Sequence, residues 1–270
     1  MKRFLAYTGL TALLSTLLLI PKDSSTGDFR KVQNSPIGPY ASGLLNAETV
    51  GEQIGYSKGI DSILVKENNQ IMKDSTVTPE EASMFIKDYR DELEQRLRTG
   101  KDGNPQFFYS TAHAYLFSGI HSLLLENNKG FNELYISRDC FKSAFERYYA
   151  SIVSGGVQND SDKVKLHDAT ISAGSGYYQT SYYLAVNFLK QAESFASDDS
   201  LDTVAVKEYY GLAKKELDDL YLTMKGIYNM KLTGINPQWR NSLSFDDNKL
   251  QELYQRLDDI GQEIGVYGEK

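Results

Sequence analysis

From residue 78 onward, apolar residues recur at the three- and four-residue spacing of an α-helix, and short polar turns separate the runs. The first run has a complete start signal, because Thr78 can cap a helix, Pro79 suits its first position and Glu81 can close a capping box. Further helices are predicted over about 106–126, 132–154, 161–196 (with a break at Gly174–Gly176), 200–230 and from 244 onward, where Leu250, Leu253, Tyr254, Leu257 and Ile260 share one face. The pattern predicts an all-α protein of antiparallel helical hairpins, arranged as a repeat-like array or a bundle.

The N-terminus has the order of a secretory signal. Lys2 and Arg3 precede the uncharged segment 4–20, and Pro21 ends it. As a helix this segment spans about 26 Å, close to the ~30 Å of a hydrocarbon core. No A-x-A cleavage site follows, so removal and retention both remain open.

This order also predicts how the chain is divided. Residues 1–21 are expected to be a signal peptide or a signal anchor that forms an N-terminal hydrophobic helix. Residues 22–42 are polar and hold two prolines, which favours a flexible linker, and residues 43–270 are expected to form the helical domain. The basic residues stay inside under the positive-inside bias, so the protein should be extracytoplasmic, either secreted or anchored to the membrane through residues 4–20.

Charge and cysteine content argue against a nucleic-acid-binding protein and against a protein held together by internal disulfides. The net charge is −7, without a cluster of Lys and Arg, so we expect no nucleic-acid partner. Cys140 is the only cysteine, so no internal disulfide can form, and its helical surroundings suggest a small buried apolar residue.

Small residues recur every fourth position ahead of the first clear helix, at Gly43, Ala47, Gly51, Gly55 and Gly59. On one helix they would form a ridge that lets another backbone approach closely. Three glycines in nine residues also weaken a helix, by about 1 kcal/mol each, so a loosely ordered segment is the alternative.

Two stretches of the chain are similar at an offset of 69 residues. The offset aligns Phe108–Thr111 with Tyr177–Thr180, and Arg138–Ala144 with Lys207–Ala213. Each second stretch has an aromatic residue with Ala three positions later, Phe141/Ala144 and Tyr210/Ala213. In this the chain resembles tetratricopeptide-type repeat proteins over about 100 residues, although the closing Pro of that family is missing. The resemblance implies an interaction scaffold rather than a catalyst.

Tyrosine is over-used, with 19 Tyr against one Trp. A tyrosine ring is apolar with a polar tip, so it suits both helix packing and binding surfaces. The candidate binding residues are the tyrosines that cluster in the second half of the chain: Tyr177, Tyr178, Tyr182, Tyr183, Tyr209 and Tyr210.

The sequence holds no recognisable catalytic or metal-binding motif, so no catalytic residue, metal ligand or cofactor is predicted. His113 and His121 are eight residues apart on one predicted helix, about 12 Å along its axis, and ligands of one zinc ion lie closer together. The third histidine is His167. The acidic run at Asn159–Asp162 lacks the glycine and glutamate of a calcium loop, and indicates a turn followed by a helix cap.

Two functions from different classes follow. The first is an exported or membrane-tethered helical scaffold or binding protein, with a protein or peptide partner. The alternative is an extracytoplasmic helical enzyme, a hydrolase that uses a histidine with a distant carboxylate. The alternative requires one of the three histidines to lie within hydrogen-bond reach of an Asp or Glu.

Overall fold

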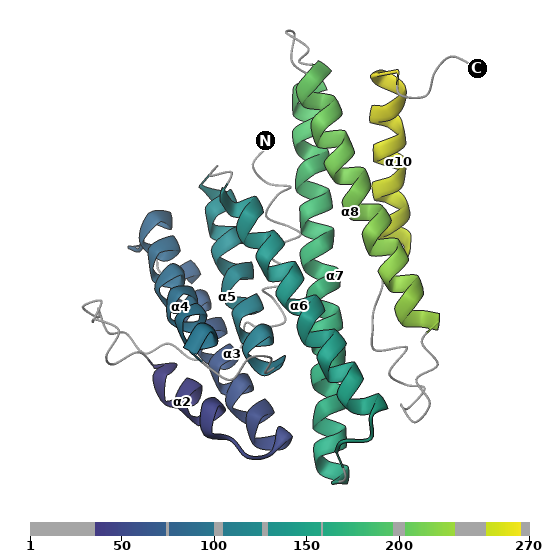
Figure 1. Ribbon diagram of the computed structural model, residues 1–270. Coiled ribbons are helices and arrows are strands. Elements are labelled where there is room, and N and C mark those ends of the chain that lie inside the picture. The colour runs from purple at the N-terminus through teal and green to yellow at the C-terminus, as the bar shows by residue number, and fades with distance from the viewer. Residues whose placement is uncertain are drawn as a thin grey trace. The chain divides into compact units, whose positions relative to one another are not determined.

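The computed structural model describes residues 36–73, 76–99, 105–125, 129–157, 159–196, 203–229 and 247–265 (Figure 1). This part of the chain forms eight helices and contains no strand, and the helices pack against one another. The all-α prediction is therefore confirmed. The segment 4–20 lies outside the described residues, so the N-terminal helix stays a prediction. Among the helices that are described, none combines the length and the apolar character needed to cross a bilayer.

The chain divides into two compact units, residues 1–130 and residues 131–270. The first unit contains α2 (Gly38–Asn46), α3 (Val50–Lys73), α4 (Pro79–Thr99) and α5 (Pro105–Leu124). The second contains α6 (Lys129–Val153) from its third residue on, α7 (Asp160–Ala196), α8 (Thr203–Asn229) and α10 (Asp247–Glu263). The helix bounds from α4 onward agree closely with those that the apolar spacing predicts.

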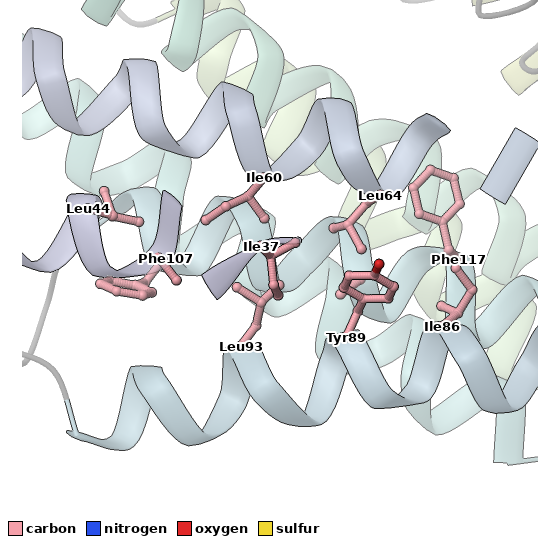
Figure 2. Close-up of a cluster of buried hydrophobic side chains, with 11 residues drawn as sticks. Ile37, Leu44, Ile60, Leu64, Ile86, Tyr89, Leu93, Phe107 and Phe117 are labelled. Carbon is pink, nitrogen blue, oxygen red and sulfur yellow. The ribbon is translucent and has the colours of Figure 1, made fainter. Parts of the chain in front are cut away.

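The core of the first unit lies between α2, α3, α4 and α5. Ile60 on α3 points toward Leu93 on α4, with Ile37 between them, and Leu64 on α3 points toward Tyr89 on α4 (Figure 2). Ile37 and Ala41 are fully buried, so the end of the segment predicted as a linker, from residue 37 on, is packed into this core.

Side-chain caps fix the starts of two helices in the first unit. At α4, Glu81 accepts a bond from the Thr78 backbone N–H at 2.8 Å, and the Thr78 hydroxyl accepts one from the Glu81 N–H at 3.2 Å. This confirms the predicted capping box. A second box precedes α3, where the Glu52 carboxylate accepts bonds from the backbone N–H groups of Glu48 and Thr49, at 3.1 Å each. These bonds lower the pKa of Glu52.

The glycine ladder belongs to two helices rather than to one ridge. The Tyr56 ring of α3 lies against Gly43 of α2, and the Tyr40 ring of α2 lies against Gly59 of α3. A Cβ atom at either glycine would collide with the ring, so the absence of a side chain allows both contacts. Gly55, by contrast, faces open space. The ladder thus joins a short helical hairpin at two points.

In the second unit, α7 and α8 lie side by side along much of their length and α10 packs against both (Figure 1). The four aliphatic residues predicted for one face of the last helix are buried: Leu250, Leu253, Leu257 and Ile260. Tyr254 is half-buried and its hydroxyl donates to Asp218 on α8 at 3.3 Å. Arg256 donates two bonds to Glu193 on α7, at 2.8 and 2.9 Å. Cys140 on α6 is half-buried rather than fully buried as predicted.

The predicted helix break at Gly174–Gly176 is wrong, because α7 continues through it to Ala196. The reason is a close contact with α6. A Cβ atom on Gly176 would lie 2.5 Å from Cε1 of the Phe141 ring, well inside van der Waals contact. Gly176 therefore allows a helix and a ring to approach closely, and the backbone stays helical since packing outweighs the propensity cost of glycine.

The internal repeat is not supported by this architecture. The boundary after residue 130 divides the first predicted copy between the two units. The second copy's first helix, α7, has 37 residues, whereas α5 in the first copy has 20. The two copies are therefore not equivalent hairpins.

Candidate functional site

The six predicted tyrosines lie on α7 and α8, and they differ in exposure. Tyr177 and Tyr210 are only 5% and 6% exposed, which leaves almost no ring area for a partner. The Tyr177 hydroxyl lies 3.5 Å from that of Thr223, across the α7/α8 contact. The other four are half-buried, so part of each side chain is exposed to a partner, although the Tyr178 hydroxyl is itself buried.

Three of these four form one group, which we call the α7 tyrosine face: Tyr178, Tyr182 and Tyr183. Tyr178 and Tyr182 are one helical turn apart and their rings stack at 6.3 Å, with 22° between their planes. Tyr183 meets Tyr182 edge-on, at 6.4 Å and 70°. Burial raises the pKa of Tyr183, and the neighbouring Tyr182 adds to this, so its hydroxyl stays a hydrogen-bond donor at neutral pH.

The helix around the α7 tyrosine face carries no charge. Between Asp168 and Lys190 lie 21 consecutive uncharged residues, in a chain whose charged fraction is 24%. Within this stretch the positions that are not fully buried are half-buried and none is exposed. Its half-buried residues are Ile171, Ser172, Ser175, Tyr178, Gln179, Tyr182, Tyr183, Val186 and Asn187. Such a surface offers aromatic contact area and neutral hydrogen-bonding groups, and α7 itself contributes no charge to it.

Tyr209, the fourth half-buried tyrosine, belongs to a different cluster. Its ring stacks on Phe195 at 5.7 Å and lies 6.2 Å from Phe188. Phe188 in turn stacks on Phe131 of α6 at 4.8 Å. These rings join α6, α7 and α8, so Tyr209 contributes to helix packing.

An ion pair that the sequence reading missed links α6 to α8. Arg138 donates to both carboxylate oxygens of the buried Glu216, at 2.6 and 2.8 Å, and its guanidinium also lies 4.9 Å from the Tyr135 ring centre. Burial raises the pKa of Glu216, and Arg138 lowers it in part. The sequence did contain a signal for this pair, because Arg138 is four residues after Leu134 and three before Phe141, and a charged residue on an apolar helix face needs a buried partner. The Arg138–Glu216 pair, which we call the clamp, holds α6 against α8 and has a structural role.

The histidines are placed among neutral or aromatic groups. His121 is buried, and its Nε2–H donates to the Asn68 amide oxygen at 2.8 Å. Burial lowers its pKa. His113 lies between Tyr109 and Phe117, and burial lowers its pKa to about 4. His167 is half-buried on α7, where burial lowers its pKa and the adjacent Asp168 opposes this.

His121 thus bonds to an amide rather than to the carboxylate that the hydrolase alternative requires. Across the described ranges, no group of three or more His, Cys, Asp or Glu side chains could hold a metal ion.

Comparison of the chain with protein-family models, with curated proteins and with solved structures gave no match. The resemblance to tetratricopeptide-type proteins therefore stays a prediction.

Proposed function

We propose that this chain is a helical binding protein that holds a protein or peptide partner on the α7 tyrosine face. The observation that carries the proposal is the ring arrangement: Tyr178, Tyr182 and Tyr183 contact one another and are only half-buried. Aromatic side chains concentrate binding energy at interfaces, and stacked rings have little conformational freedom left to lose. The absence of charge in this stretch favours a partner segment that is itself apolar or neutral.

The proposal places this activity outside the cytoplasm, with the chain exported or tethered by residues 4–20. Support comes from the basic start and the uncharged run of 17 residues that follows it. Fractionation of the native host, followed by N-terminal sequencing, tests this part. An intact Met1 in the soluble cytosolic fraction would contradict both export and anchoring.

Site-specific photocrosslinking in the native host tests the binding face. A photoreactive residue at Gln179, among the three tyrosines, should give a discrete adduct with one partner. The same residue at Lys207, which is exposed on α8, is the matched control. Adding Tyr182→Ser should abolish the adduct at residue 179 while leaving the helical circular dichroism signal unchanged. Identical adducts at both positions, or an adduct that persists in Tyr182→Ser, would rule out this face.

A further inference from the structure

A line of buried polar side chains joins α3 to α5 within the first unit. The Ser57 and Ser110 hydroxyl oxygens are 2.8 Å apart, and His121 bonds to Asn68 at 2.8 Å. Both pairs are separated by 53 residues, so α3 and α5 run parallel and stay in register over the three turns between the pairs. We call the Ser57, Asp61 and Ser110 part of this line the acid seam.

Asp61 lies one turn after Ser57 and forms a hydrogen bond with Ser110. Asp61 as a residue is half-buried, but its Oδ1 atom is buried without a hydrogen-bond partner, so the bond to Ser110 involves Oδ2. An ionised carboxylate has two oxygens that need donors, and leaving one of them bare in a buried place is strongly unfavourable. A carboxylic acid needs far less, since its single proton can be donated to Ser110.

The direction of the hydrogen bonds then follows from the proton on Asp61. A protonated Asp61 donates to Ser110, Ser110 donates to Ser57, and Ser57 donates to the backbone carbonyl of Gln106, which lies 3.4 Å away. Each hydroxyl gives one bond and receives one. If Asp61 is ionised, the chain must reverse, and the Gln106 carbonyl loses its donor from Ser57.

From this geometry we propose that Asp61 is an uncharged carboxylic acid that holds α3 against α5, and that loss of its proton opens this contact. The first unit would then respond to rising pH through Asp61. Burial raises the pKa of Asp61 well above its usual range, with Ser110 and Lys58 opposing the shift. A raised pKa means that the stabilisation is complete at low pH and is lost as the pH rises through the folded-state value.

The other titratable groups near the acid seam do not account for a pH response of the contact between α3 and α5. On α3, Lys58 is exposed. Burial also raises the pKa of Glu67, which lies nearly two turns beyond Asp61 and so away from Ser57 and Ser110. On α2 the one titratable side chain is Tyr40, which lies against Gly59. On α5, His113 follows Ser110 by about one turn, and its lowered pKa keeps it neutral. On α4, the charges of Glu92 and of Glu67 from α3 act on Tyr89.

Carbon-13 NMR of the carboxyl groups in the full chain tests the protonation directly. The Asp61 resonance, assigned by its loss in Asp61→Asn, should keep the position of a protonated acid at pH 6. An ordinary aspartate, with a pKa of about 3.9, is more than 99% ionised there. An Asp61 signal that titrates near pH 4 in the wild-type chain would overturn the proposal.

Amide hydrogen exchange tests the opening. After correction for the intrinsic pH dependence of exchange, α3 and α5 should lose protection over the same pH range in which the Asp61 resonance changes. Asp61→Asn, whose amide can still donate to Ser110, should remove this step. Asp88→Asn, at an exposed aspartate of α4, should keep it. A step that survives in Asp61→Asn, or is absent from the wild-type chain while Asp61 ionises, would contradict the coupling.

Discussion

The two units bury polar groups in different ways. The first unit joins its helices through neutral partners such as Ser57 with Ser110 and Asn68 with His121. The second unit joins α6 to α8 through a pair of charges, Arg138 with Glu216. Among the groups that join α3 to α5, Asp61 and His121 can change protonation at moderate pH, whereas a guanidinium keeps its charge throughout. We therefore expect the first unit to be sensitive to pH and the second to be sensitive to substitution at its clamp.

The largest effect should come from breaking that clamp. Arg138→Met leaves Glu216 buried without its cation and should lower the free energy of unfolding of the second unit by about 3–5 kcal/mol. Urea denaturation followed by hydrogen exchange in α7 measures this. Lys142→Met, at an exposed position of α6, is the control.

The double variant Arg138→Met/Glu216→Leu sharpens the result. Because it removes both charges, it should recover most of the lost stability. A loss below about 1 kcal/mol in the single variant would show that the buried pair is not what holds α6 to α8.

Acid should destabilise the first unit more than the second. The His113 pKa is about 4 in the fold and 6.5 when unperturbed, so the unfolded chain binds its proton first. Stability is complete above pH 6.5 and falls as the pH drops toward 4, by at most about 3 kcal/mol for this group. Exchange protection in α5 at pH 7 and pH 4.5, compared in the Asp61→Asn background so that Asp61 does not contribute, measures the loss.

His113→Phe should remove much of this dependence, since the new ring can still pack between Tyr109 and Phe117. His167→Gln, in the second unit, should change it little. If α7 loses protection before α5 on acidification, the contrast between the units is wrong.

Close packing at Gly176 predicts an intermediate effect. Gly176→Ala should cost about 1–3 kcal/mol, because the new methyl group meets the Phe141 ring. Gly211→Ala on α8 has open space and should instead stabilise the second unit by up to about 1 kcal/mol. Thermal unfolding of both variants distinguishes the two outcomes, and equal effects would show that helix propensity alone decides.

The smallest effect concerns the α4 cap in the first unit. Thr78→Ala removes the hydroxyl that accepts from Glu81 N–H and should cost about 1 kcal/mol. Thr78→Ser keeps the hydroxyl and should stay within a few tenths of a kcal/mol of the wild type. Urea denaturation of the full chain measures both, and a loss in Thr78→Ser as large as in Thr78→Ala would assign the effect to the methyl group.

Local patterns predicted the helices because their causes are local. The capping box at Thr78 and the apolar face of α10 depend on residues within a few turns of one another, and both were found. Gly176 was misread because its role depends on Phe141, 35 positions earlier on another helix. The Asp61–Ser110 and Arg138–Glu216 contacts likewise join helices, and spacing along one helix cannot reveal a partner on another. The tyrosines were predicted as one set, and the split between the α7 tyrosine face and Tyr209 depends on which ring each one meets.

The two tyrosine–glycine contacts of the α2/α3 hairpin also determine its alignment. Sliding α3 by one turn in one direction would bring Tyr40 to Gly55 but Tyr56 to Pro39. Sliding it the other way would bring Tyr56 to Ala47 and Tyr40 to Ile63. Only the observed pairing places a glycine against each ring. Small residues at every fourth position would by themselves allow several alignments of α2 and α3, and the two tyrosines select one of them.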